Sequence, residues 1–466
     1  MEESLMNIVQ QAAEKISQEM ISQFVGIQNH EVNFTELVEN IQSCVHEIGV
    51  SMIETLIIEA DSALRQSSVR KQEWFIQRNE DTKICATMLG PVELSRTYFK
   101  HKKDQHFSYL LDEYLGILPY DRMDTGLKSQ ILETTTDRSY QQTVNQFQHS
   151  GITSKATIKN VVHRLDAENL IVSGQRQDKT PKVLFIEADE DHVAYQDGTN
   201  RFMKLVYVHE GYQSNSGQIK RLRLKNCHYF SGLYPDGQRL WEEVYAYLDA
   251  SYDLGKVDRI YFSGDGAPWI KEGAKYIPNT TFVLDQFHTV KYVKKACTGL
   301  ASGAPILLDW INKNHKKFVQ AFFTSRLEDH TLSGNQRKQI SQAKRYLLGN
   351  WEAIQNQHNV DYIGCSAEGH VSHILSSRLS SRPLGWSKIG ANNIAKMRVF
   401  LRNKGNLMVH LELKNKEIQK DSRVQRLDKR VNRPKPTIDQ SFFAKLPLLE
   451  NGLITGTRNR VVSVIK

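Results

Sequence analysis

The chain has 466 residues, which is too long for one hydrophobic core and predicts roughly two to four domains. Its 61 Lys and Arg residues outnumber 52 Asp and Glu residues, so the net charge is +9 and the pI is about 9.1. This modest basic excess favours an acidic partner such as nucleic acid. The five cysteines form no CxxC pair, which argues against a disulfide framework and a zinc knuckle.

The sequence carries no recognisable membrane or export signal. It has no run of about 18 apolar residues, and its beginning, MEESLMNIVQ, is acidic and unlike a signal peptide. We therefore expect a soluble protein of the cytoplasm that associates with the nucleoid and has no membrane partner.

Residues 1–80 are predicted to form an N-terminal helical region. Glycine and proline are sparse there, and apolar residues recur at helical spacing, as at Ile48, Met52, Leu56 and Ile57. This pattern favours helix packing or self-association.

Residues 81–175 are predicted to contain a hairpin and then a DNA-binding region. The turn signal Leu89-Gly90-Pro91 lies between two short apolar runs, and a helical face over 109–118 follows. Next come a helix, a glycine-containing turn and a second helix that Ser154 caps. The residues expected to face DNA are Ser154, Lys155, Thr157, Lys159, Asn160 and Arg164, and those expected inside are Ile158, Val161, Val162 and Leu165.

This layout is typical of a helix-turn-helix, whose second helix enters the major groove of DNA. A plain helical hairpin has the same pattern and is the alternative interpretation. The polar stretch over 175–182 then predicts a linker.

An α/β domain is predicted to begin at Val183. Strands are expected over 183–189, 202–208, 219–230, 257–263 and 280–285. One helix is expected to bury Leu240, Trp241, Val244, Tyr245 and Leu248, and a second to begin at Pro268. The order β-β-β-α-β-α-β is that of a ribonuclease-H-like core with a mixed five-stranded sheet.

We expect this core to span 176–300 and 361–400. A basic helical insertion over 301–360 interrupts it, and a basic C-terminal tail over 401–466 follows. Basic runs are usually solvated surface, but in this chain they are also expected to bind DNA phosphates without sequence preference.

Three acidic residues are expected to converge at one edge of the sheet. Asp189 ends the first strand, Asp265 follows the fourth, and Glu368 begins a helix after the insertion. Carboxylates at one point repel each other unless a cation joins them. Two Mg²⁺ ions, with Mn²⁺ as an alternative, would bind these oxygens and stabilise the attacking and leaving oxygens of a phosphodiester.

Two assignments remain open at this stage. Strand alternation puts Glu187, Asp189 and Asp191 on one face and Glu190 on the other, so Asp191 is an alternative to Asp189. Asp265 lies between two glycines that would let a ligand approach, but it is also placed to cap the following helix.

Other residues near these acids are candidate auxiliary groups. Asp285 ends the fifth strand, and His288 lies one helical turn later, where it would orient a base or phosphate or only cap the helix. Arg378 and Arg382 are expected to hold phosphates. Trp386 would stack on a base or, as aromatic residues more often do, fill the core.

The chain closely resembles the ISLre-two family of bacterial insertion-sequence transposases in FIEADEDHV, SGDGAPWI, LDQFHTVKY and GCSAEGHVSHILSSRLSSRPLGWS. This family is similar to Mutator-type transposases. The resemblance implies a metal-dependent DDE-type DNA transposase with a ribonuclease-H-like domain and a helical insertion before the last acid. It implies that Asp189, Asp265 and Glu368 are the catalytic triad and that Asp285 and His288 match a (Cys/Asp)-x-x-His signature.

A transposase would use cut-and-paste or copy-out chemistry on terminal inverted repeats. Because two ends must be processed together, a dimer or larger homo-oligomer on DNA is expected. Two other classes remain: a structure-selective nuclease that cuts without joining, and a transposase-derived protein that only binds DNA.

Overall fold

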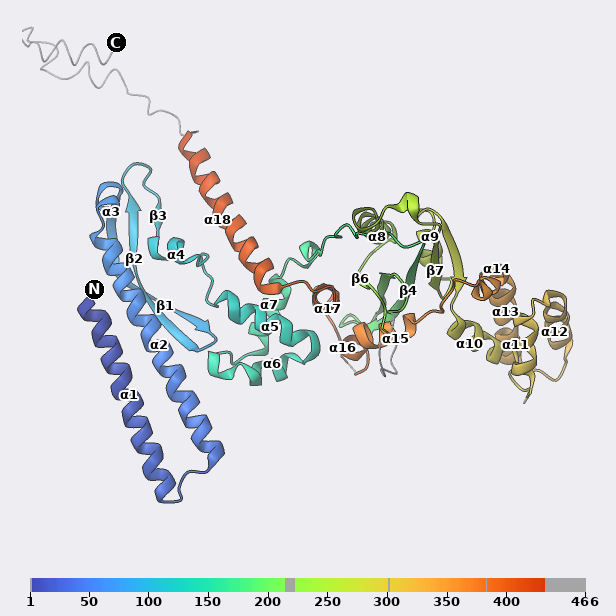
Figure 1. Ribbon diagram of the computed structural model, residues 1–466, viewed down its shortest axis with the longest axis horizontal. Coiled ribbons are helices and arrows are strands. Elements are labelled where there is room, and N and C mark those ends of the chain that lie inside the picture. Colours follow the sequence, from blue (N-terminus) through green and yellow to red (C-terminus); the bar gives the residue numbers. More distant parts are fainter. Residues whose placement is uncertain (1, 214–222, 301, 383, 432–466) are drawn as a thin grey trace, which may run out of the picture. The chain divides into compact units, whose positions relative to one another are not determined.

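The computed structural model describes residues 2–213, 223–300, 302–382 and 384–431, with side chains described between 6 and 422 (Figure 1). The chain divides into two compact units. The first contains Met1–Leu56, Thr82–Leu94 and Arg122–Glu412, and the second contains Ile57–Asp81, Ser95–Asp121 and Leu413–Lys466.

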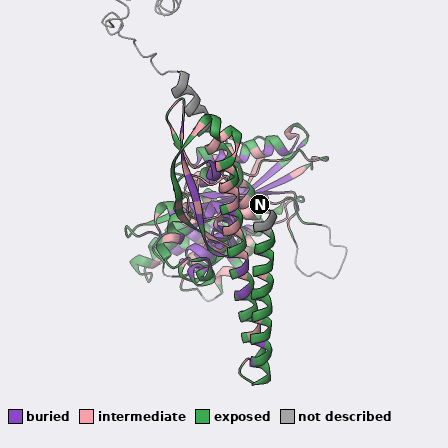
Figure 2. Cartoon of the chain, turned by 90° about the vertical axis from the view of Figure 1, so that its left-hand side faces the viewer, coloured by how far each residue is buried: buried purple, intermediate pink, exposed green. Residues whose placement is uncertain are grey.

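The N-terminal region is helical as predicted through Glu73, but residues 74–80 belong to the strand β1 (Trp74–Thr87) and not to a helix. It contains α1 (Glu2–Gln28), α2 (Phe34–Gln66) and α3 (Ser68–Glu73). Lys15 of α1 pairs with Glu47 of α2 at 2.7 Å. Of the predicted apolar face, Ile48 and Ile57 are buried, whereas Met52 and Leu56 are 41% and 48% exposed. Most of α1 and the first part of α2 is exposed (Figure 2), so these helices bury less than the pattern predicts.

Within the described residues, α2 is long and apolar enough to cross a membrane by length and composition. The same test is passed by core helices of soluble proteins, so it is weak evidence. The absence of a membrane partner therefore stays a prediction.

The hairpin is longer than predicted. β1 (Trp74–Thr87), β2 (Gly90–His101) and β3 (Phe107–Ser108) form a three-stranded sheet in that order. The sequence does not predict the first half of β1, because the exposed polar run QRNE (77–80) has no alternation of apolar residues. The helix α4 (Leu110–Leu115) follows, with Tyr114 74% exposed.

Three helices then pack together: α5 (Thr125–Asp137), α6 (Tyr140–Gln146) and α7 (Lys155–Arg164). A 3₁₀ turn (Gln148–Ser150) separates α6 from α7, and Gly151 beyond it has a φ of +80°. Ser154 caps α7 as predicted, because its Oγ accepts a hydrogen bond from the backbone N–H of Ala156 at 3.1 Å. Ile158 and Val162 are fully buried in α7.

The predicted mixed five-stranded sheet is confirmed. It consists of β4 (Val183–Ala194), β5 (Asn200–His209), β6 (His228–Gly232), β7 (Arg259–Gly264) and β8 (Thr280–Leu284). The spatial order is β6-β5-β4-β7-β8, with β5 antiparallel to both β4 and β6, and with β7 parallel to β4 and β8. The third strand is shorter than predicted, since β6 begins at His228. Of the residues predicted to precede it, 219–222 lie outside the described residues.

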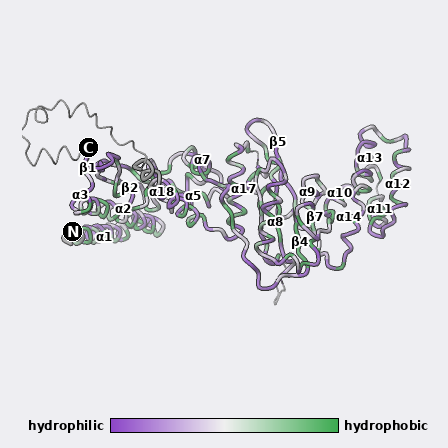
Figure 3. The backbone as a smooth tube through the Cα atoms, turned by 90° about the horizontal axis from the view of Figure 1, so that it is seen from above, coloured by the Kyte–Doolittle hydropathy of each residue, from purple (hydrophilic) through white to green (hydrophobic). Residues whose placement is uncertain are grey.

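Helices cover both faces of this sheet. Leu184, Ile186 and Ala188 of β4 pack with α8 (Gln238–Ser251) and α9 (Pro268–Gly273). Val193 of β4 packs on the opposite face with α15 (Ala367–Val371) and α17 (Lys388–Arg402). Hydrophobic and polar residues mix along α8 and α17 (Figure 3), as expected of helices with one buried face. Tyr245, predicted to be buried in α8, is 39% exposed.

The predicted helical insertion is present, and it packs on the end of the sheet. Its helices are α11 (Gly303–Asn312), α12 (Lys316–Glu328), α13 (Gly334–Gly349) and α14 (Trp351–Gln355). They share a core with Leu284 at the end of β8 and Val293 of α10 (Gln286–Ala296). The remaining elements are 3₁₀ turns at Ala167–Asn169, Leu254–Lys256 and Asn356–His358, a π-helical turn at Ser372–Ser376, α16 (Ser377–Leu379) and α18 (Leu407–Val431).

The buried ring of His228 should make folding sensitive to acid. It stacks on Tyr247 of α8 with ring centroids 3.9 Å apart, and burial lowers the pKa of His228 from 6.5 to about 4. The unfolded chain therefore takes up this proton first, so the contribution to stability is full above pH 6.5 and is lost as the pH falls toward 4. We expect His228→Gln to flatten the fall in stability across that window, measured by urea unfolding at a series of pH values. An equal fall in the free energy of unfolding with pH in the wild type and in His228→Gln would contradict this. The control is His330→Gln, which changes an exposed histidine.

Candidate functional site

Asp189, Asp265 and Glu368 come from β4, the loop after β7 and the first turn of α15. Asp189 is buried, whereas Glu368 is exposed. Burial raises the pKa of Asp189 to about 7, and the negative charges of Asp265 and Glu368 act in the same direction. The charges of Asp265 and Glu368 therefore act on Asp189, and the convergence of all three carboxyl groups at one point stays a prediction.

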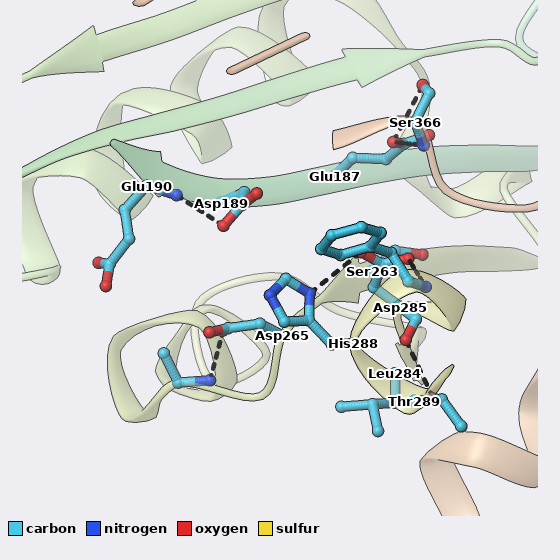
Figure 4. Close-up of polar contacts among 12 residues, drawn as sticks. Glu187, Asp189, Glu190, Ser263, Asp265, Leu284, Asp285, His288, Thr289 and Ser366 are labelled. Atoms are coloured by element: carbon cyan, nitrogen blue, oxygen red, sulfur yellow. Dashed lines mark hydrogen bonds and ion pairs between the residues drawn. The ribbon is translucent and has the colours of Figure 1, made fainter. Parts of the chain in front are cut away.

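His288 is directed toward the same acids. Its Nδ1 lies 3.2 Å from Oδ2 of Asp285, and the ring lies between Asp285 and the Asp189 side of the site (Figure 4). Burial opposes protonation, but Asp285, Asp189 and Asp265 together raise the pKa of His288. Asp285 also caps α10 through the backbone N–H of Phe287 at 3.0 Å. The cap on α10 is therefore present and is made by Asp285, whereas the orientation of a base or phosphate by His288 stays a prediction.

The loop that carries Asp265 is closely packed. Asp265 Oδ1 accepts a hydrogen bond from the backbone N–H of Ala267 at 2.8 Å. Ala267 is itself the N-cap of α9, which has no side-chain cap, so Asp265 fixes the turn before the helix and the capping interpretation is wrong. A Cβ on Gly264 would lie 2.8 Å from the carbonyl oxygen of Ala188, and Gly266 has a φ of +83°. These glycines are explained by strand packing and by the turn, and not by space for a ligand.

The helical insertion supports this loop directly. Tyr346 of α13 donates a hydrogen bond to the backbone carbonyl of Asp265 at 2.5 Å, and its ring stacks on Tyr292 of α10 with centroids 3.7 Å apart. Asn350 accepts a hydrogen bond from Lys271 of α9 at 2.6 Å. Sequence reasoning did not find these contacts, because nothing in the local pattern links residues about eighty positions apart.

The acidic residues of β4 separate by strand alternation, as predicted. Glu190 accepts a hydrogen bond from Nε1 of Trp269 at 2.8 Å on one side of the sheet. On the other side, Asp191 Oδ1 accepts from Ser376 at 2.9 Å and from Ser380 at 2.8 Å. Asp191 Oδ2 is buried and has no hydrogen-bond partner within the described residues, so Asp191 stays the alternative to Asp189.

Glu187 has a structural position that the sequence did not reveal. Its carboxylate is buried and accepts hydrogen bonds from the backbone N–H of Ser366 at 2.6 Å, from His209 Nε2 at 3.0 Å and from the Tyr207 hydroxyl. Burial would raise the pKa of Glu187, but the His209 contact and the other hydrogen bonds lower it. Ser366 directly precedes α15, so Glu187 anchors the helix that carries Glu368. Its only sequence signal was membership of the acidic run EADEDH.

The two candidate arginines differ in position. Arg378 is buried; its Nε donates to the carbonyl of Thr135 at 3.0 Å, and its guanidinium lies 4.7 Å from the Trp386 ring centre. This is a packing role in place of the expected phosphate contact. Trp386 is buried in the core, which corresponds to the commoner of its two interpretations. Arg382 is exposed, as a phosphate-binding residue would be.

Among the described residues, one group of three metal-binding side chains has all its ligand atoms within 4.8 Å of one another. It consists of His101, Asp104 and His106 in the second unit, and sequence reasoning missed it. Asp189, Asp265 and Glu368 do not form so compact a group. Binding one cation through all three would require side-chain movement, and the exposed Glu368 is the freest to move.

Comparison with known proteins identifies relatives across most of the chain. A model described as "Uncharacterised protein family (UPF0236)" matches residues 27–417. Two UPF0236 proteins from Caldanaerobacter subterraneus subsp. tengcongensis are each 37% identical to it over 402 residues, or 86% of this chain. These matches cover 85% and 80% of the respective relatives. The chain therefore belongs to the uncharacterised protein family UPF0236.

Proposed function

We propose that this protein is a DDE-type DNA transposase of an insertion sequence. The observation that carries the proposal is the buried carboxyl of Asp189: burial raises its pKa to about 7, and the charges of Asp265 and Glu368, which are far away in sequence, act in the same direction. A cluster that costs stability is expected where chemistry requires it. Three antiparallel strands followed by two parallel crossovers are also the arrangement expected of a ribonuclease-H-like core.

The ligand types of the three acids would suit a pair of divalent cations once the side chains move together. Asp189, Asp265 and Glu368 supply only oxygen ligands, which Mg²⁺ and Mn²⁺ prefer, and the raised pKa of Asp189 means that positive charge nearby would favour its ionised form. When bound, such ions lower the pKa of an attacking water or 3′-hydroxyl and offset charge on the departing oxygen.

The surrounding residues would position DNA and the acids. His288, with its raised pKa, would offer a positive N–H to a phosphate near Asp189, and Asp285 would fix the ring orientation. Glu187 would hold the start of α15, and Tyr346 would hold the backbone of Asp265. The Glu187 and Tyr346 contacts each fix a segment that carries one of the three acids.

The name of one relative also supports the proposal that the gene is transposed within genomes. A UPF0236 protein of Caldanaerobacter subterraneus subsp. tengcongensis, 37% identical over 402 residues, has a name that joins eleven locus names. One protein with many loci in a genome is what repeated copying of its gene would produce. Such copying is the expected behaviour of an insertion sequence.

The α6–turn–α7 segment would act as a helix-turn-helix on the terminal repeats. Lys155, Lys159, Asn160 and Arg164 are exposed on α7, and Thr157 is half-buried. We expect Lys159→Ala to weaken binding to all DNA sequences and to reduce the salt dependence by about one charge. Asn160→Ala should cost about 1–3 kcal/mol on the repeat only.

Fluorescence anisotropy on repeat and scrambled duplexes at several salt concentrations would measure both effects. The matched control is Lys182→Ala, since Lys182 is also exposed but pairs with Asp258 at 3.2 Å. Unchanged binding in both α7 variants would leave the helical hairpin interpretation.

Cleavage and joining of DNA test the proposed function itself. The full chain would be incubated with Mg²⁺, a target plasmid and duplexes from both flanks of its gene, carrying the inverted repeats. We expect nicking at the repeat ends followed by joining of the 3′-hydroxyl to the target. Cleavage without joining would indicate the nuclease alternative, and repeat binding without cleavage would indicate a protein that only binds DNA.

A further inference from the structure

The loop between β2 and β3 brings three potential metal ligands together in the second unit. Nδ1 of His101 and Nδ1 of His106 each lie 2.5 Å from the same oxygen, Oδ1 of Asp104. The ligand atoms all lie within 4.8 Å of one another, and the two histidines are only five positions apart in the chain. We propose that His101, Asp104 and His106 bind a divalent transition metal, with zinc as the best match.

The ligand types favour zinc over magnesium. Two imidazole nitrogens and one carboxylate oxygen form a set typical of Zn²⁺, Fe²⁺ and related ions, whereas Mg²⁺ prefers oxygen ligands alone. Zinc takes four ligands at about 2.0–2.2 Å, so three protein atoms leave one position for water or a further ligand. Both histidine nitrogens would have to move away from Oδ1 of Asp104 to admit an ion, because they lie 2.5 Å from it and two tetrahedral ligands of one zinc lie farther apart than that.

The loop backbone fixes the cluster without help from the metal. The backbone N–H of His101 donates to the carbonyl of His106 at 2.8 Å, and that of Gln105 donates to the carbonyl of His101 at 3.1 Å. Gln105 has a φ of +61°, an uncommon conformation for a residue other than glycine. Such a closed loop pre-organises its side chains, which lowers the entropy cost of binding an ion.

The surroundings also resemble a built metal site. The Trp74 ring lies against both imidazoles, edge to face, with centroids 4.8 Å from His101 and 4.7 Å from His106. His101 is buried, and the Asp104 side chain is 11% exposed. A hydrophobic wall and limited solvent access strengthen the binding of a cation to its ligands. The His106 side chain, 26% exposed, leaves an entry path from solvent.

Metal content and stability test this site directly. The full chain would be stripped with a chelator, reloaded with ZnCl₂ and dialysed, and its zinc measured by atomic emission. We expect one zinc per chain, retained in the exposed His330→Gln control and reduced at least tenfold in His106→Gln and Asp104→Asn. Zinc should also raise the melting temperature of the wild type, as any ligand of the folded state does.

Cobalt substitution keeps the test decisive if the variants fold poorly. Co²⁺ in the wild-type site should give visible absorption bands without a thiolate charge-transfer band, because its ligands are nitrogen and oxygen. A wild type that retains no zinc, variants that retain it fully, or a thiolate band in the cobalt protein would each overturn the proposal. MgCl₂ added in parallel separates this site from the acidic cluster, which carries the proposed DNA chemistry.

Discussion

Asp265→Asn should lower strand cleavage by several orders of magnitude while the protein still binds repeat DNA. The substitution removes charge and keeps shape, so the hydrogen bond from Ala267 to the side-chain oxygen can remain. Asp189→Asn and Glu368→Gln should act in the same way, because each removes one carboxylate from a shared cation site. Cleavage of end DNA in Mg²⁺ and Mn²⁺ measures the loss, and anisotropy on the same duplex measures binding.

The strand β4 provides a matched control for these variants. Glu190→Gln changes an acid of the same strand that accepts a hydrogen bond from Trp269 on the opposite side of the sheet; the charge of Asp265 also reaches Glu190, so cleavage should fall far less than in Asp265→Asn but need not be unchanged. Loss of activity in Asp191→Asn but not in Asp189→Asn would move the first catalytic acid to Asp191. If all three acid variants kept wild-type cleavage, the proposed chemistry would be wrong.

The same proteins should differ in their response to metal. Mg²⁺ or Mn²⁺ should raise the melting temperature of the wild type, since an ion that binds only the folded state stabilises it. This shift should vanish in Asp265→Asn and remain in Glu190→Gln. Because it needs no DNA, it tests the cation site separately from the choice of substrate.

Glu187→Gln should also reduce cleavage strongly, although Glu187 is not expected to touch the substrate. The backbone N–H of Gly211 donates to Nδ1 of His209, so Nε2 of that ring must carry the hydrogen that Glu187 accepts. A glutamine amide offers one acceptor oxygen, while His209, Ser366 and Tyr207 all donate toward this site. At least one buried donor is left unpaired, at a cost of about 1–3 kcal/mol.

The expected consequence is a loosened start of α15 and a displaced Glu368. Urea unfolding measures the stability loss, and cleavage would be assayed at a temperature where circular dichroism shows the variant folded. Tyr207→Phe removes a single donor and should be milder. A Glu187→Gln protein with unchanged stability and activity would mean that this carboxylate does not anchor α15.

The sheet was predictable because its strands are short apolar runs with clear ends. VLFIEAD runs into further acids and VDRIYFS is followed by Gly-Asp-Gly. Alternation along β4 assigned Glu190 and Asp191 to opposite faces. The hairpin was less predictable, since half of β1 is polar and exposed. A local sequence pattern predicts a strand from its buried apolar residues, and an exposed strand has few of them.

The acidic residues of the candidate site could be chosen from the sequence, but the residues that hold them in place could not. Asp265 follows β7 and Glu368 begins α15 as predicted, whereas Asp189 lies within β4, which continues to Ala194 beyond the predicted strand end. Glu187 and Tyr346 act through contacts with residues far along the chain, which a local pattern does not show. The role expected for Arg378 differed for a related reason. An arginine at this place suggested phosphate binding, but the fold buries its side chain against Trp386 and Thr135. Which side of a helix faces the core depends on packing partners that a local pattern does not contain.

The π-helical turn Ser372–Ser376 has a consequence for how this segment evolved. A π turn holds one residue more than an α turn, so removing one residue there would restore a regular helix. Every later side chain would then rotate by about 100° relative to Glu368. Ser380 would turn away from Asp191, and Arg378 from Trp386. Single-residue deletions in this stretch should therefore be rare among natural relatives, even where substitutions are common.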